Sequence, residues 1–235
     1  MAADKPIAER HVREANAEVT YSEGEALSLL KQKSQSAAFL EQLSRSKIGQ
    51  NRKVRLALVE HSRTPRHVSL PIIGRMYTFD LMRIALSPAV ATDVKVAAEE
   101  AIIKRLETIS AGERQTLAKR ASARVAGALL LDAETRVVRA SLENPRLTEA
   151  DVIRAIGNGK APEGLAEVVC RHKKWSLRSE IRAALLHSAN TPLRYALEFA
   201  RALPVEQVRQ ILKRSRQPAN IRQSLLKHVA ECSKV

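Results

Sequence analysis

Apolar residues recur at helical spacing along most of the chain. Near the start, Ala26, Leu29 and Leu30 and then Leu40 and Leu43 follow the i, i+3, i+4 pattern that places side chains on one face of a helix. No segment shows the strict apolar and polar alternation of a strand. The pattern therefore predicts an all-α fold.

Helix-boundary signals support this assignment. Ser22 with Glu25, and Ser110 with Glu113, have the spacing of a capping box, in which the serine caps a helix and the glutamate bonds back to it. Gly157 follows a periodic segment, and we expect it to end that helix in the left-handed conformation.

One short pattern recurs along the chain: a β-branched apolar residue, a basic residue, any residue, a small residue and leucine. Copies of this pentad begin at Val54, Val138, Ile181 and Ile221, and a looser copy begins at Val94. The intervals of 40 to 44 residues are typical of solenoid repeats of two or three helices. About five degenerate repeats are expected, stacked so that each covers the apolar face of its neighbour.

A threonine stands ten residues after the first position of three pentads. These residues are Thr64, Thr148 and Thr191, and Pro65 and Pro192 follow two of them. Threonine caps helix N-termini and proline fits the first helical position. Each repeat is therefore predicted to contain a short helix, a tight connection, a capped second helix and usually a third.

These signals predict a simple domain organisation. Residues 1–21 are expected to form a polar N-terminal tail, and residues 22–235 a single helical-repeat domain. Within that domain, residues 22–48 are assigned to an N-terminal cap helix and residues 49–235 to the repeats.

The pentad helix followed by a short turn resembles HEAT-type repeats. The segment from Val138 to Thr148 is similar to the leucine-rich repeat variant, a bacterial α-solenoid, and the resemblance covers roughly residues 50–230. It implies a right-handed superhelix that acts as a binding scaffold. Variant-repeat proteins can carry a cysteine-ligated iron–sulfur cluster, but Cys170 and Cys232 are too few to hold one, so we expect no cofactor.

Composition narrows the classes further. Aromatic residues make up only 3% of the chain, so the core must consist of Leu, Ile, Val and Ala. The two cysteines form no Cys-x-x-Cys pair, and the polar start has no apolar signal-peptide segment. No apolar stretch is long enough to cross a bilayer. A reduced, cytoplasmic protein is expected.

The basic residue of each pentad has two interpretations. A structural ladder, in which each cation bonds an acid or carbonyl of the adjacent repeat, is favoured over a stripe that faces phosphates. Asp93, Glu134 and Glu180 are the candidate acidic partners. The five basic residues are Arg55, Lys95, Arg139, Arg182 and Arg222.

Charge suggests a partner. The chain has a net charge of +15. The segment from Arg171 onward contains 14 Lys and Arg residues and four Glu residues, so its net charge is +10. Two clusters, on adjacent predicted repeats, favour an acidic macromolecule, with DNA or RNA bound through its phosphate backbone as the leading candidate. Trp175 is expected to pack between helices. The candidate nucleic-acid-binding residues are Arg171, Lys173, Lys174, Arg178, Arg209, Lys213, Arg214 and Arg216.

Catalytic motifs are lacking, so no catalytic residue, metal site or enzyme activity is expected. The run from Gly157 to Lys160 lacks the spacing of a phosphate-binding loop, and Glu60, His61 and His67 lack metal-ligand spacing. Two alternatives remain. One is a protein–protein interaction scaffold, and the other is an enzyme that resembles HEAT-like DNA glycosylases. Such enzymes use an acidic residue among aromatics, whereas Asp151 is interpreted as a helix-cap charge.

Overall fold

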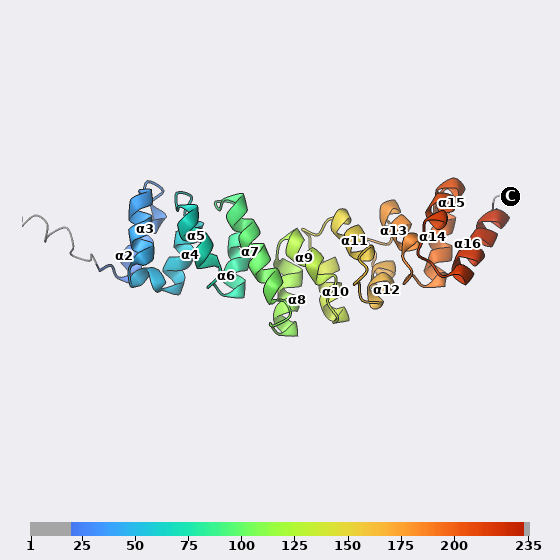
Figure 1. Cartoon of the computed structure of the whole chain (residues 1–235), viewed down its shortest axis with the longest axis horizontal. Helices are drawn as coiled ribbons and strands as arrows, with labels where there is room; N and C mark the ends of the chain where they lie inside the picture. The colour runs from blue at the N-terminus through green and yellow to red at the C-terminus, as the bar shows by residue number, and fades with distance from the viewer. Residues whose placement is uncertain (1–19, 233–235) are drawn as a thin grey trace, which may run out of the picture. The chain divides into compact units, whose positions relative to one another are not determined.

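The computed structural model describes residues 20–232, with side chains described as far as Lys227, and it is all-α over that range (Figure 1). The chain divides into two compact units, residues 1–101 and residues 102–235, within the range where one repeat domain is predicted. The boundary falls inside helix α7 (Thr92–Arg105). The tail predicted over residues 1–21 lies outside the described residues except for its last two positions.

Unit 1 begins with two helices where one long cap helix over 22–48 is predicted, so that prediction is wrong. The polar segment 32–36 separates them, because Ser36 starts the second helix by accepting a hydrogen bond from the N–H of Phe39 at 3.2 Å. The capping box of Ser22 and Glu25 is confirmed. The helices that precede α7 are α2 (Glu23–Lys31), α3 (Ala37–Arg45), the 3-10 helix η1 (Ile48–Gln50), α4 (Arg52–Glu60), α5 (Arg66–Ile73) and α6 (Thr78–Leu86).

Helix α4 is the centre of unit 1. It contacts α2, α3, α5 and α6, and its Val54 and Leu58 are fully buried against Ala26 and Leu40. At its end, His61 Nε2 lies 3.2 Å from the carbonyl oxygen of Gln32, so the loop after α4 is bonded to the loop after α2. Helices two apart in the chain are therefore neighbours in space.

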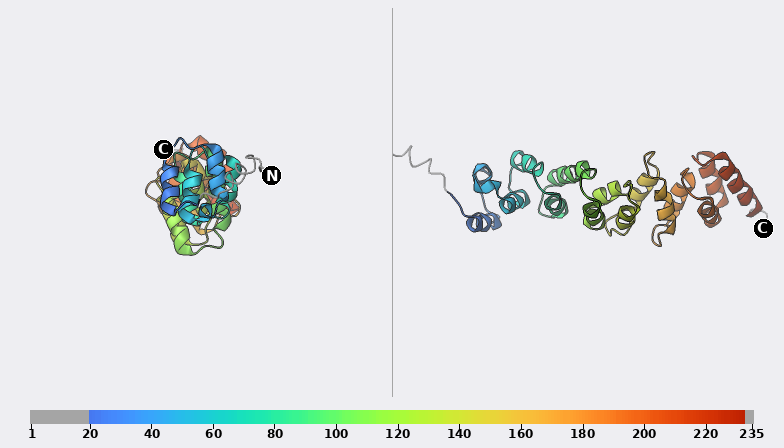
Figure 2. Two further views of the ribbon diagram at one scale, coloured as in Figure 1. Left: turned by 90° about the vertical axis from the view of Figure 1, so that its left-hand side faces the viewer. Right: turned by 90° about the horizontal axis from the view of Figure 1, so that it is seen from below.

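Unit 2 contains short helices joined by tight loops, which follow one another in chain order from light green to red (Figure 2). They are α8 (Ala111–Arg120), α9 (Ala123–Leu129), α10 (Thr135–Leu142), α11 (Glu149–Ile156), α12 (Gly164–Arg171), α13 (Ser179–His187), α14 (Leu193–Ala202), α15 (Val205–Lys213) and α16 (Ala219–Cys232). The capping box of Ser110 and Glu113 at the start of α8 is confirmed.

The helices of unit 2 pack in two rows. Helices α8, α10 and α12 contact one another in succession, and so do α9, α11, α13 and α15, while α14 contacts α16 (Figure 1). Packing therefore repeats every two helices. The pentads, however, recur on every third helix, namely α10, α13 and α16 in this unit. Arg139 and Arg182 consequently lie in different rows.

The structure does not show a continuous ladder of pentad cations. Two of its three candidate acids pair elsewhere, since Arg66 Nε lies 2.9 Å from Asp93 and Arg136 Nε lies 3.4 Å from Glu134. Arg182 donates to the carbonyl of Ser176 in the preceding loop, and Arg139 is exposed. The alternation between rows explains this result, because residues in different rows cannot form one column.

A continuous apolar core runs through unit 2 from Ala126 to Leu225. Its fully buried side chains are almost all Leu, Ile, Val and Ala, as predicted, with Phe199 as the large exception. Trp175 is buried as predicted, and its indole Nε1 donates to the carbonyl of Leu142 at 2.8 Å. The ring is thus buried with its N–H satisfied, and the bond links the loop after α12 to the end of α10 in the same row.

Hydrogen bonds tie the loops of unit 2 into two sets. In the first set, Asn144 Nδ2 donates to the carbonyl of Ala118, so the loop after α10 is bonded to the end of α8. Trp175 donates to Leu142, so the loop after α12 is bonded to the end of α10. In the second set, the backbone N–H of Arg216 donates to the carbonyl of His187 at 2.9 Å. That bond joins the loop after α15 to the end of α13.

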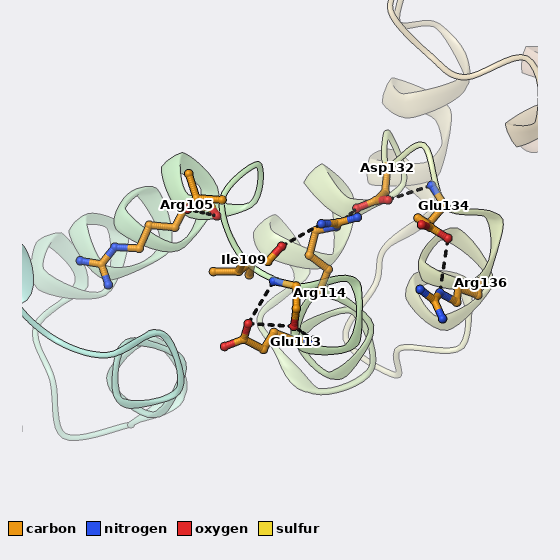
Figure 3. Close-up of polar contacts among 9 residues, drawn as sticks. Arg105, Ile109, Glu113, Arg114, Asp132, Glu134 and Arg136 are labelled. Atoms are coloured by element: carbon orange, nitrogen blue, oxygen red, sulfur yellow. Dashed lines mark hydrogen bonds and ion pairs between the residues drawn. The ribbon is translucent and has the colours of Figure 1, made fainter.

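A largely buried ion pair links the start of α8 to the loop before α10. Figure 3 shows Arg114, on α8, extending between Ile109 and Asp132. Its Nε lies 2.6 Å from Asp132 Oδ2, and its Nη1 donates to the Ile109 carbonyl at 2.9 Å. Asp132 Oδ1 also accepts the N–H of Glu134, so the carboxylate orders the loop before α10.

The predicted helix boundaries are confirmed only in part. Thr148 caps α11 in a capping box with Asp151, as expected. Thr64 and Thr191 instead donate to the carbonyls of Leu58 and Leu185, both at 2.6 Å, because the proline that follows each of them occupies the cap position. Gly157 does end a helix, but with a right-handed backbone (φ −75°) where a left-handed one is predicted.

Candidate nucleic-acid interface

The structure separates the eight predicted binding residues into two groups. All eight are exposed. Arg171, Lys173, Lys174 and Arg178 lie at the end of α12 and in the loop before α13. Arg209, Lys213, Arg214 and Arg216 lie on α15 and in the loop after it.

These two groups lie at opposite ends of helix α13. The first group precedes its N-terminus, whereas Arg216 is hydrogen bonded to His187 at its C-terminus. A helix of nine residues is about 13 Å long, so about that length of helix lies between Arg178, at the N-cap of α13, and the residue to which Arg216 is bonded. We therefore treat the two groups as separate basic surfaces.

The first group continues into a groove along the row formed by α8, α10 and α12. A hollow of about 660 Å³ between α10 and α12 adjoins one of about 590 Å³ between α8 and α10. Thr135, Arg139 and Glu143 line both hollows, so together they form one surface, which we call the row groove. Its charged residues are the cations Lys119, Arg136, Arg139, Arg171, Lys173 and Lys174 and the anions Glu143 and Glu167.

Three of the six cations are available to a ligand. Among the residues that the structure describes, the side chains of Lys119, Arg139 and Lys173 form no ion pair or hydrogen bond, and all three are exposed. Arg136 forms only a long contact of 3.4 Å to Glu134. Six cations against two carboxylates give the groove a net charge of +4.

The other cations are held in place by neighbouring side chains. Arg171 Nη2 lies 2.6 Å from Glu167, and its Nε donates to the hydroxyl of Tyr195 at 3.4 Å. The Tyr195 hydroxyl and the Glu167 carboxylate raise the pKa of Arg171, so this guanidinium stays charged. Glu167 also binds Arg194 at 3.0 Å, which extends the basic surface to α14.

Lys174 is fixed by the buried tryptophan. Its Nζ lies 4.1 Å from the centre of the Trp175 ring, within the range of a cation–π contact. His172 Nε2 lies 3.1 Å from Glu143 Oε1, so one of the two carboxylates of the row groove contacts an imidazole. Trp175 thus supports the surface and offers no exposed ring to a base.

Sequence reasoning missed Lys119 and Arg136, and it favoured a structural role for Arg139. These residues belong to no charge cluster in the sequence, and the row brings them to Lys173 and Lys174. The sequence does contain a signal for the packing of this row. Asn144 and His172 follow successive helices of the row, α10 and α12, and are 28 residues apart. Each side chain accepts a hydrogen bond from the backbone N–H two residues further along the chain. That interval identifies the two-helix period that the pentads obscure.

The described part of the chain shows no cluster of metal-ligating side chains. No group of three or more His, Cys, Asp or Glu side chains among the described residues is placed to hold a metal ion. Asp151 Oδ2 accepts from the backbone of Thr148, and its Oδ1 lies 3.2 Å from Arg154. This carboxylate acts as a helix cap.

Comparisons with known proteins give no assignment. No family model, no curated protein and no solved structure matches the chain. In the described residues, no helix combines the length and the apolar character that a membrane span requires.

Proposed function

We propose that the chain is a helical-repeat binding module that holds the phosphate backbone of a nucleic acid in the row groove. The observation that carries the proposal is the continuous groove with a net charge of +4, in which Lys119, Arg139 and Lys173 have no partner among the described residues. Lysine and arginine side chains that neutralise phosphates release the cations condensed on the nucleic acid, and that release drives binding.

The proposed binding is directed to the backbone and independent of base sequence. Trp175, beside the groove, is 2% exposed, and no Phe, Tyr or Trp is among the residues that line the groove, so the large rings that stack on bases are missing there. Lysine and arginine side chains contact phosphates without reading base edges. We expect similar affinity for oligonucleotides of equal length and different sequence.

The proposed architecture is a right-handed α-solenoid of the HEAT-like or leucine-rich-repeat-variant type. The support is contact between helices two places apart in the chain, seen in each unit taken separately. In unit 1 the series is α2, α4 and α6; in unit 2 the series are α8, α10 and α12, then α9, α11, α13 and α15, and the pair α14 and α16. Solenoids of this kind bind extended ligands along one row of helices. A phosphate backbone that follows α8, α10 and α12 fits that mode.

A titration at varied salt tests the proposal. Fluorescence anisotropy of a labelled 20-mer, as duplex DNA and as single-stranded RNA, is measured between about 50 and 300 mM NaCl. Neutralising four to six phosphates gives a slope of about −4 to −5 for log K against log salt on the duplex. Absence of binding at about 50 mM salt contradicts the proposal and favours the protein–protein scaffold.

The glycosylase alternative has a separate test. Asp151 is held in its capping box by Thr148 and Arg154, a geometry that supports a structural role. Alkylated duplex DNA is incubated with the purified chain and analysed for released base. Release that is lost in Asp151→Asn would replace the binding-module proposal with an enzymatic one.

A further inference from the structure

A second basic cavity lies in unit 1 and is independent of the row groove. It has a volume of about 230 Å³ and is bounded by α3, η1, α4 and α5. Three arginines line it: Arg45 of α3, Arg55 of α4 and Arg75, in the loop after α5. We call it the arginine cavity.

Two of the three guanidinium groups are fixed by hydrogen bonds. Arg55 Nη2 donates to Gln50 Oε1, and Gln50 Nε2 in turn donates to the carbonyl of Ser44 at 3.3 Å. Arg45 Nη2 pairs with Glu41. Guanidinium groups held this way lose little freedom when a ligand binds, which favours affinity.

A close backbone approach brings Gln50 to this position. Gly49, in η1, packs so tightly on α3 that a Cβ there would lie 2.2 Å from the carbonyl oxygen of Leu43. Only glycine permits that contact. Gly49 therefore lets η1 approach α3, and this approach places the neighbouring Gln50 beside Arg55. The cavity wall is therefore determined by the backbone.

The cavity carries an excess of positive charge. Glu41 is its single carboxylate, and that group already pairs with Arg45 and lies 3.5 Å from Nε2 of His67. Arg75 has no side-chain partner among the described residues and is exposed. Arginine presents a planar set of donors that matches phosphate oxygens, and several arginines around one small volume suit a doubly charged oxyanion.

Size and the apolar wall restrict the ligand further. The volume is below the range of about 300–1,000 Å³ that suits drug-sized ligands, so the cavity suits one phosphate group with a small attached body. Val68, Pro71 and Ile72 of α5 form its apolar side. Such a wall contacts the organic part of a phosphate ester.

We propose that the arginine cavity binds a phosphomonoester dianion, whose phosphate contacts Arg55 and Arg75 and whose organic group lies against α5. Free phosphate carries the same chemistry without the apolar body. The proposal does not depend on the proposed function, because no residue of the row groove takes part.

Isothermal titration of the full chain with phenyl phosphate and, in a second arm, inorganic phosphate tests the proposal at constant ionic strength. We expect phenyl phosphate to bind in the millimolar range or tighter, and inorganic phosphate at least threefold more weakly. Arg55→Gln and Arg75→Gln are each expected to weaken phenyl phosphate binding at least tenfold. Lys33→Gln, which removes an exposed charge of the same unit outside the cavity, is the matched control and keeps wild-type affinity.

Two results overturn the proposal. One is absence of binding of phenyl phosphate at 10 mM, and the other is equal weakening by Lys33→Gln and Arg75→Gln. Arg75 is exposed, so its variant keeps the fold, and an unchanged thermal midpoint verifies this. Lys173→Gln, in the row groove, is expected to leave phenyl phosphate binding unaltered, so failure of this site is distinguishable from failure of nucleic-acid binding.

Discussion

Asn144 Nδ2 donates to the carbonyl oxygen of Ala118 at 2.7 Å, and this bond fixes the loop after α10 to the end of α8. The same nitrogen reaches Ala121 at 3.1 Å, and Oδ1 accepts the N–H of Arg146 at 2.8 Å. Asn144 is 1% exposed, so these contacts have no competition from water. The side chain therefore sets the spacing between two neighbouring helices of the row groove.

We predict that Asn144→Ala lowers the free energy of unfolding by about 1–3 kcal/mol. Buried carbonyl groups lose their donor, and an unsatisfied buried polar group costs that much. Urea denaturation followed by circular dichroism measures the change. Asn158→Ala, which removes an exposed turn asparagine, is the control and is expected to cost about 0.5 kcal/mol or less. Equal effects of the two substitutions would contradict the assigned role.

The pair of Arg114 and Asp132 gives a second stability prediction. Both side chains are largely buried, at 18% and 7% exposure, and removing one partner leaves a charge without compensation. Asp132→Asn is expected to destabilise the protein by about 3 kcal/mol. Arg154→Met removes a side chain that is 75% exposed and leaves Asp151 in its capping box with Thr148, so it should cost less than about 1 kcal/mol. A loss at Asp132 no larger than that at Arg154 would show that the ion pair contributes little.

Cys170 provides a test by chemical labelling. Burial, helped by Glu198 and Glu167, raises the pKa of its thiol from 9.0 to about 12, so the reactive thiolate is scarce at pH 8 in the folded state. In a Cys232→Ser background, we predict that iodoacetamide labels Cys170 at the rate of global unfolding. Because the folded pKa is raised, the stability from this group is complete below about pH 9 and declines as pH rises toward 12. Rapid labelling of the folded chain at pH 8 would contradict the buried placement.

Gly49 tests the backbone approach that shapes the arginine cavity. A methyl group at this position overlaps the Leu43 carbonyl, so Gly49→Ala is expected to lower the thermal midpoint and to cost about 1–3 kcal/mol or more. Gly24→Ala in α2 of the same unit meets no atom within 4 Å and removes a glycine from a helix, so it should stabilise by up to about 1 kcal/mol. The opposite sign of the two effects is the measurable outcome, and a neutral Gly49→Ala would refute the tight contact.

Local features of the fold are readable from the sequence. The capping boxes at Ser22 and Ser110 depend on residues three positions apart, and both are present in the structure. The core composition follows from the shortage of aromatic residues. The long cap helix over 22–48 is wrong because Ser36, an N-cap residue, outweighs the apolar periodicity on either side of it.

The packing period is not readable from the pentads. Their interval of 40 to 44 residues spans three helices, whereas neighbours in space are two helices apart. Stacking is set by apolar burial between rows and by loop bonds such as Asn144 to Ala118, which leave only a weak mark on the sequence. The sequence does not reveal the row groove for the same reason. Lys119 and Lys173 lie far apart in the chain, and the packing of α8, α10 and α12 brings them to one groove.

The most direct test of the account compares two charge-matched variants in duplex DNA binding at about 50 mM NaCl. The groove variant replaces Lys119, Arg139, Lys173 and Lys174 with glutamine, and the control replaces Arg209, Lys213, Arg214 and Arg216, the group at the other end of α13. Both lose four positive charges, so nonspecific attraction falls equally. We predict at least a hundredfold loss of affinity in the groove variant and less than a tenfold loss in the control. Equal losses, or a larger loss in the control, would contradict binding in the row groove.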